Sequence, residues 1–420
     1  MSEETRSAMT AAFEAPSGDD GVVLINCAVF DAARSVPLSD AGIWVRGDRI
    51  AAVGPVDDVR SRAGRATLVD LDGATVLPGL VNMHAHFGDD MVAPPKDAAE
   101  CAVAAASDAQ RTLHAGITTV RLVAQAFGVD FALRRAITRR ALAGPRIFTA
   151  GRAIACTGGH CHSSPITTES DGTAEFRKAV RREVSAGADL IKLMLSGGIA
   201  GENEGVDTPQ ITGDELSAVL EIAHAWDRKV TAHAGPGDII ADAVKRGLDG
   251  VEHGYQLNDA AIRAMAERQV LLVPTLAVTR CRELFERVGA PAWMIERSME
   301  AGGAHVDGVA AAVAAGVPVA VGTDMLPGEP YEGTFAHARE MEYLVELAGL
   351  TPAQAIAATT ITPARWLGID GELGTVDEGK FADLVACDGD PSTDVSVVRS
   401  LRFVMKSGAI VRHDRRSPIA

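Results

Sequence analysis

The chain has 420 residues, 47% hydrophobic and 23% charged, enough for one large domain and a smaller one. Its net charge of −16 argues against nucleic acid or an anionic membrane surface as a partner. The six cysteines form no CxxC pair, which argues against a disulfide framework. Without a membrane-length apolar run or a signal-peptide pattern, the sequence predicts a cytoplasmic protein.

The sequence predicts short strands near both ends of the chain. Residues 1–21 are polar and acidic, and we expect a mobile tail there. The segment 22–76 is apolar and β-branched, with Gly and Asp between the runs, and this style returns in 375–420. We expect these two segments to pair into one small β-sandwich.

The middle of the chain, 77–374, alternates apolar runs with helical stretches, as βα units of a parallel sheet do. Eight such units predict an α/β fold, a (β/α)8 TIM-type barrel. The predicted strands are LVNMHAH (80–86), GITTVRLV (116–123), RIFTAG (146–151), DLIKLML (189–195), KVTAH (229–233), GVEHG (250–254), VLLVPTL (270–276) and VPVAVGTD (317–324).

Chemically distinctive residues lie in or at the ends of these runs, where a barrel of this type carries its active site. His84 and His86 are two apart, which places both side chains on one face of a strand. Each residue alone has a structural explanation, such as a helix cap or a paired lysine. Together, imidazoles, a carboxylate and an amine at successive strand ends predict a divalent metal site. The remaining members are Lys192, His233, His253 and Asp324.

Lys192 is the least expected member, because it stands between Ile191 and Leu193 in an apolar run. Burial of the amine lowers its pKa and makes it a better nucleophile. Such an amine can add carbon dioxide to form a carbamate, whose two oxygens could bridge two metal ions.

These motifs resemble the amidohydrolase superfamily, binuclear type, from residue 22 onward. Within it the chain is most similar to the prolidase-like and imidazolonepropionase-like branch, whose members include dipeptidases, ochratoxin amidohydrolases, and phenylurea and thiocarbamate hydrolases. The context HAHFGDD departs from the family, where a different residue often follows the second histidine, and this change is expected to reshape the pocket rim without touching the ligands. The matching segments are VLPGLVNMHAH, LIKLMLSGG, VTAHA, GVEHG, VGTD and GTVDEGKFADLV.

The resemblance implies a ligand set for two divalent ions, with zinc expected and manganese, cobalt or iron left open. His84, His86 and Asp324 would bind the more buried ion. His233 and His253 would bind the second, and carboxylated Lys192 would bridge the two.

A hydroxide bridging the ions would attack an amide-type C–N bond of a small molecule: a peptide, N-acyl amino acid, carbamate or urea. Asp324 would act as general base and then general acid. Two alternatives remain: a mononuclear deaminase of a heterocycle, which would not need Lys192, and a non-catalytic scaffold. Relatives often form oligomers, so a homo-oligomer is expected.

Three residues are candidates for substrate contacts. The resemblance favours His160, in ACTGGHCHSS, as a hydrogen-bond donor to the carbonyl oxygen. His162 and Tyr255 could line the pocket or be structural, and a third metal near Cys161 is a further alternative. The Gly-rich loop 196–210 and the loop after Asp324 have the composition of substrate loops.

Overall fold

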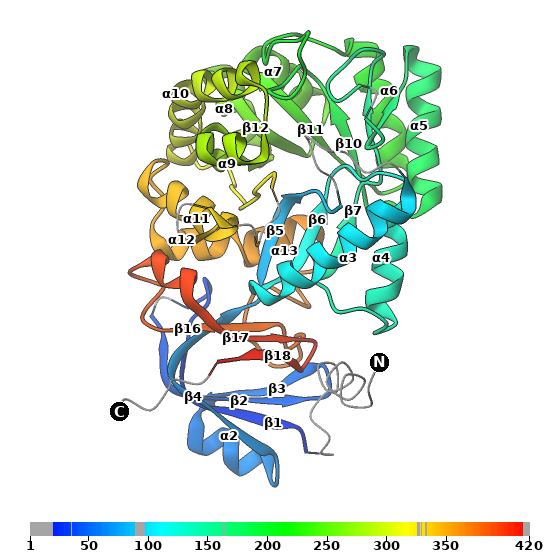
Figure 1. Cartoon of the computed structure of the whole chain (residues 1–420). Coiled ribbons are helices and arrows are strands. Elements are labelled where there is room, and N and C mark those ends of the chain that lie inside the picture. The colour runs from blue at the N-terminus through cyan, green and yellow to red at the C-terminus, as the bar shows by residue number, and fades with distance from the viewer. Residues whose placement is uncertain are drawn as a thin grey trace.

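The computed structural model describes residues 20–34, 36–88, 97–162, 164–325, 328, 330–331 and 334–414. Figure 1 shows a barrel-like part above and a sheet below, and the sheet carries the first and last colours of the chain. The predicted mobile tail, apart from Asp20 and Gly21, lies outside the described residues.

Strands from both ends of the chain build the lower sheet. Its order is β18-β17-β16-β4-β1-β2-β3, so β4 joins the two ends by pairing parallel with β1 and antiparallel with β16. Its core includes Leu24, Ile43 and Phe403, all fully buried. The strands are β1 (Val22–Val29), β2 (Leu38–Arg46), β3 (Arg49–Pro55), β4 (Thr67–Pro78), β16 (Leu384–Cys387), β17 (Leu401–Lys406) and β18 (Ala409–His413).

The pairing of the two chain ends therefore agrees with the expectation from sequence. β4 continues to Pro78, two residues past the predicted limit at residue 76. The division at 22–76, 77–374 and 375–420 remains a prediction.

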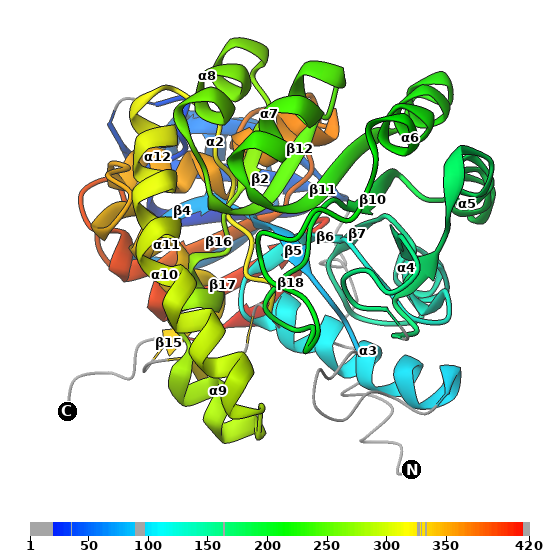
Figure 2. The same ribbon diagram turned by 90° about the horizontal axis from the view of Figure 1, so that it is seen from above.

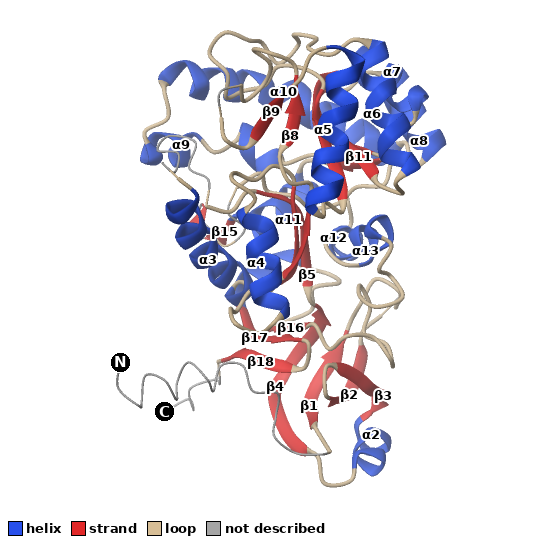
Figure 3. Ribbon diagram, turned by 90° about the vertical axis from the view of Figure 1, so that its right-hand side faces the viewer, coloured by secondary structure: helices blue, strands red, loops and turns tan. Residues whose placement is uncertain are grey.

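Parallel strands form the barrel, whose helices lie outside them (Figures 2 and 3). Seven of the eight predicted runs are strands, and β8 and β9 are two short additions after the third. The barrel strands are β5 (Leu80–Ala85), β6 (Ile117–Leu122), β7 (Arg146–Thr149), β8 (Ala153–Ala155), β9 (Thr167–Glu169), β10 (Leu190–Met194), β11 (Lys229–Pro236), β12 (Gly250–Gln256) and β13 (Leu271–Val273).

The eighth run, 317–324, has only an isolated bridge from Val319 to Leu272. Its backbone nevertheless closes the barrel. The Ala320 N–H donates to the Leu272 carbonyl at 2.9 Å, and the Met83 N–H donates to the Val321 carbonyl at 2.9 Å. The predicted fold class, a barrel with a small β domain, is thus confirmed.

The helices α3 to α7 pack against the barrel strands, whereas α2 packs against β1, β2 and β3 of the lower sheet. α6 begins with the capping box of Thr212 and Glu215, which satisfies N–H groups that the first turn leaves unpaired. No helix in the described part of the chain is long and apolar enough to cross a membrane. The helices are α2 (Val56–Ala63), α3 (Ala98–His114), α4 (Val129–Thr138), α5 (Gly172–Ala186), α6 (Gly213–Ala225), α7 (Gly237–Arg246), α8 (Asp259–Arg268), α9 (Arg282–Val288), α10 (Ala292–Ala314), α11 (Ala336–Glu346), α12 (Pro352–Ala358), α13 (Ile361–Leu367) and the 3-10 turns η1 (Leu276–Thr279) and η2 (Val395–Ser400). The short strands β14 (Pro330–Tyr331) and β15 (Thr334–Phe335) form a separate hairpin.

Candidate metal centre

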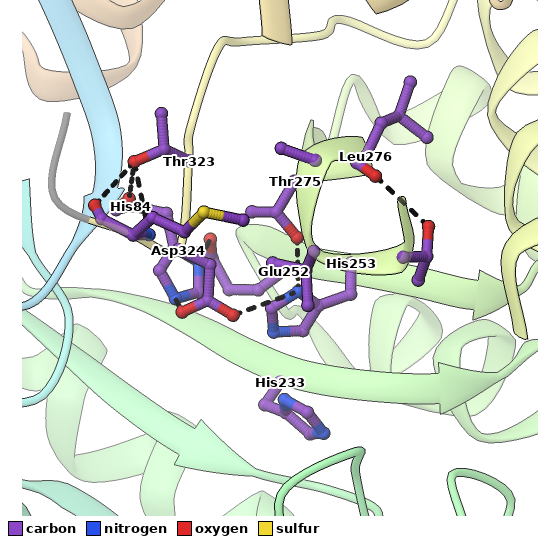
Figure 4. Close-up of polar contacts among 12 residues, drawn as sticks. His84, His233, Glu252, His253, Thr275, Leu276, Thr323 and Asp324 are labelled. Carbon is purple, nitrogen blue, oxygen red and sulfur yellow. Dashed lines mark hydrogen bonds and ion pairs between the residues drawn. The ribbon is translucent and has the colours of Figure 1, made fainter. Parts of the chain in front are cut away.

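Left-handed backbone occurs within β12, just after β13 and at the end of the eighth predicted run. His253, Thr275 and Asp324 have φ angles of 66°, 55° and 53°. Non-glycine residues rarely adopt this conformation, which costs on the order of 1–3 kcal/mol each. The bends interrupt the alternation of a regular strand, and Figure 4 shows His253 and Asp324 directed toward one another.

Three of the predicted ligands meet at one point. The Nε2 atoms of His84 and His86 lie 2.9 and 3.1 Å from Asp324 Oδ1, and 3.3 Å from each other. Two nitrogens bound to a tetrahedral zinc at about 2.0–2.1 Å would be about 3.3 Å apart. The donor set and its spacing therefore fit a divalent ion, as the clustering of these three residues within 4.8 Å also indicates.

The other ring nitrogen of each histidine in this trio is held by an oxygen. His84 Nδ1 lies 2.7 Å from Glu252 Oε2, and His86 Nδ1 lies 2.9 Å from the Ala124 carbonyl oxygen. An acceptor at Nδ1 fixes the proton there and leaves the Nε2 lone pair for an ion. The two side chains are therefore oriented as metal ligands.

His233 and His253 lie on the neighbouring strands β11 and β12, with ring centroids 4.7 Å apart. His233 Nε2 is 3.1 Å from the Gly197 carbonyl oxygen, and His253 Nδ1 is 2.7 Å from Thr275 Oγ1. Each ring again keeps one nitrogen for a ligand role. Burial, then neighbouring positive groups, holds the pKa of both rings well below the usual range, so both are neutral.

Lys192 projects from β10 and is only 2% exposed. Its strand pairs with β11, so that Lys192 is level with Thr231 and Met194 with His233. Burial lowers the pKa of the amine to about 8, although Glu252 and Asp324 oppose the shift. At a pKa of about 8, roughly a tenth of this amine is neutral at pH 7, far more than for an ordinary lysine.

Sequence reasoning missed a buried ion pair beneath these ligands. Arg121 on β6 donates to Glu252 on β12 at 2.5 Å, and both side chains are fully buried. Thr231 also donates to Glu252 Oε1. Burial opposes ionisation of Glu252, but Arg121, Lys192 and His84 hold its pKa well below the usual range. The sequence did contain a signal for this pair, because the apolar runs GITTVRLV and GVEHG each hold one charged residue, and the two charges are opposite.

A cavity of about 360 Å³ opens above the ligands. The predicted ligands, His160, Cys161 and Tyr255 all line it. His162 does not line it, and its Nδ1 instead lies 3.1 Å from the Gly159 carbonyl oxygen. Tyr255 stacks on the His253 ring at 5.0 Å. Residues 326–327, 329 and 332–333 of the loop after Asp324 lie outside the described residues.

His160 is held between a predicted ligand and the Gly-rich loop. Its ring stacks on His233 at 4.2 Å, and its Nδ1 bonds to Glu204. Gln210 donates to Glu204 at 2.5 Å and accepts from the His160 N–H at 2.8 Å. Burial opposes a charge on the ring, but Cys161 and Glu204 raise the pKa of His160 to about 10. A protonated ring keeps an N–H at Nε2.

Comparison with known proteins identifies the family of this chain. Residues 75–411 match the amidohydrolase family. The chain belongs to the amidohydrolase family. It is 28% identical to an ochratoxinase of Aspergillus niger, covering 90% of this chain and 84% of that protein. An imidazolonepropionase of a Geobacillus species is 24% identical over 89% of this chain and 92% of its own.

Among solved structures, a Xaa-Pro dipeptidase with bound methionine is 30% identical, with a TM-score of 0.82 over 93% of this chain and 99% of that one. These relatives belong to the prolidase-like and imidazolonepropionase-like branch expected from the sequence. Because the family and these relatives are hydrolases, the comparisons support the expectation that this protein is an enzyme.

Proposed function

We propose that this amidohydrolase uses two divalent ions to hydrolyse an amide-type C–N bond of a small molecule. The observation that supports this most strongly is the convergence of His84 Nε2, His86 Nε2 and Asp324 Oδ1, with each histidine's other nitrogen held by an oxygen. A carboxylated Lys192, His233 and His253 would complete the set. Zinc suits these ligands, and manganese, cobalt or iron would also be accepted.

The ions, when bound, would supply a hydroxide nucleophile near neutral pH and polarise the scissile carbonyl. Asp324 would take the proton of the attacking water and return it to the leaving nitrogen as the C–N bond breaks. His160 would donate from Nε2 to the carbonyl oxygen, where negative charge develops. Glu204 would keep the imidazole in that orientation through Nδ1.

The second candidate, a mononuclear deaminase, also uses histidines and an aspartate. Lys192 argues against it, because a buried amine among neutral imidazoles has no role in a one-ion site. A non-catalytic scaffold is disfavoured by the complete ligand set.

Metal analysis and mass measurement of the native protein test the proposal. We expect nearly two divalent ions per chain and an added carboxylate on Lys192. The Lys192→Ala variant should retain at most one ion and lose activity, with partial recovery in a small carboxylate such as formate. One ion per chain with an unmodified lysine would favour the deaminase instead.

A further inference from the structure

The cavity above the predicted metal ligands has two unlike sides. One side consists of the histidines, Lys192 and Asp324 at the strand ends. The other, which we call the apolar wall, comes from the segment that follows β13. It consists of Val278, Leu284, Phe285, Val288, Ala290 and Met294.

The apolar wall is built by η1, the short helix α9 and the start of α10. Leu284, Phe285 and Val288 fall on one face of α9, since residues three and four apart are neighbours on a helix. Leu284 and Phe285 are 8% and 6% exposed, whereas Val288 is 45% exposed at the end of the helix. α9 packs against α10, which carries Met294. The wall therefore extends from the interior to the rim.

The protonated ring of His160 is already paired with Glu204, so the described lining offers no unpaired positive charge for a substrate. Its only lysine is Lys192, which the proposed function assigns to the ions, and no arginine is among the described lining residues. Arg297 lies nearby on α10, but its guanidinium donates to backbone carbonyls of the Gly-rich loop, including those of Gly201 and, at 3.3 Å, Gly198.

A substrate carboxylate placed against the apolar wall would lose its hydration without gaining a cation or a set of hydrogen bonds. An aromatic or branched aliphatic group there would instead be removed from water, which raises affinity about fourfold per buried methylene. The lining thus favours substrates with an uncharged apolar group over substrates with a carboxylate.

We propose that the enzyme selects uncharged amides, carbamates or ureas that carry a bulky apolar group, rather than free dipeptides or N-acyl amino acids. The group on one side of the scissile bond lies against the apolar wall while the carbonyl faces the metal ligands. This inference rests on the proposed function for the identity of the bond.

A matched pair of substrates tests it. N-(2-phenylethyl)benzamide and N-benzoyl-phenylalanine share both rings and the scissile amide, and differ only in the carboxylate. With metal-loaded enzyme, we expect kcat/KM for the neutral amide to exceed that for the acid by about tenfold or more. An equal or higher value for the acid would overturn the inference.

Binding of the corresponding benzenesulfonamides, which resist hydrolysis, separates this inference from the proposed function. Calorimetry should give a dissociation constant at least about tenfold lower for the neutral sulfonamide. If neither amide is cleaved but the neutral sulfonamide binds more tightly, the proposed function fails and the substrate class stands. Tighter binding of the acid contradicts the substrate class whether or not turnover occurs.

A charge placed on the apolar wall gives a third readout. Val288→Lys puts a cation at the rim, and we expect it to shift the ratio of the two dissociation constants toward the acid by about tenfold. Val103→Lys is the control, since Val103 is 75% exposed on α3 and does not line the cavity. An unchanged ratio in the Val288 variant would count against the wall as the binding surface.

Discussion

Behind the residues at the mouth of the barrel lie further residues that hold them in place. His84 presents Nε2 to Asp324 because Glu252 binds its Nδ1, and Glu252 stays ionised in the interior because Arg121 lies against it. Arg121 also donates to the Met83 carbonyl at 2.5 Å and stacks 4.8 Å from the Trp366 ring. The orientation of one predicted ligand therefore depends on Arg121, which contacts it only through Glu252.

The Arg121–Glu252 pair should show strong coupling. Because removing one partner leaves a buried uncompensated charge, Glu252→Gln and Arg121→Met should each lower the free energy of unfolding by about 3–5 kcal/mol. The double variant should lose less than the sum. Urea unfolding of the four proteins measures this, and strictly additive losses would contradict the coupling.

The same variants separate stability from metal binding. Glu252→Gln should weaken metal affinity by about 10–100-fold, because the acceptor at His84 Nδ1 loses its charge. Arg121→Met should weaken it less, since Glu252 remains. Competition with a chelator reports both affinities.

Gly198 provides a test of the His160 orientation. A Cβ at this position would lie 2.3 Å from His160 Cε1, so the imidazole would have to move. We expect Gly198→Ala to lower kcat on the order of a hundredfold, as for loss of a donor to the carbonyl oxygen, with unchanged metal content. Gly303→Ala is the control, because a Cβ there meets nothing within 4 Å. Wild-type kcat in Gly198→Ala would remove His160 from the proposed mechanism.

At the scale of elements, the segment after β13 connects the centre to the apolar wall. Thr275 binds His253, and η1 follows immediately. Glu340 on α11 accepts the N–H groups of Leu276 and Ala277 at 2.8 Å each, and so ties α11 to the first turn of η1. This buried carboxyl lies between two elements and does not line the cavity.

Glu340 should make stability depend on pH. Burial raises its pKa from 4.5 to about 8, although the two N–H groups oppose the shift. Between these values the folded state holds a proton that the unfolded state releases, so the free energy of unfolding falls as pH rises, by at most about 1.4 kcal/mol per pH unit. Glu340→Gln cannot titrate and should show a flatter profile. Urea unfolding of metal-free protein from pH 6 to 9 compares the two, and parallel profiles would refute the shift.

At the scale of the whole molecule, the chain ends form a sheet with its own core beside the barrel. Phe403 from the C-terminal end is fully buried with Leu24 and Ile43 from the N-terminal end. Strand β4 leads from this sheet into β5, which carries His84. The sheet therefore supports the barrel without contributing a described residue to the cavity.

Loss of packing in the sheet should cost stability and leave the centre intact. Phe403→Ala should lower the free energy of unfolding by about 3–5 kcal/mol, with unchanged metal content and kcat in the folded protein. Leu68→Ala on β4 is the control, since Leu68 is 46% exposed. A loss of bound metal in folded Phe403→Ala would show that the sheet shapes the centre directly.

The sequence by itself determined the barrel, the pairing of the two ends and the strand positions of the predicted ligands. These follow from local periodicity and from the rule that barrel strands end at one mouth. It did not determine the Arg121–Glu252 pair, the Glu204–His160 contact or the apolar wall. Arg121 and Glu252 are 131 positions apart in the chain, and His160 and Glu204 are 44 apart. The apolar wall lies roughly 200 positions after His84. Only the tertiary structure decided these features, because contacts between residues so far apart depend on how the elements pack, which local periodicity does not encode. Left-handed backbone at His253, Thr275 and Asp324 likewise sets side-chain directions that alternation along a strand does not predict.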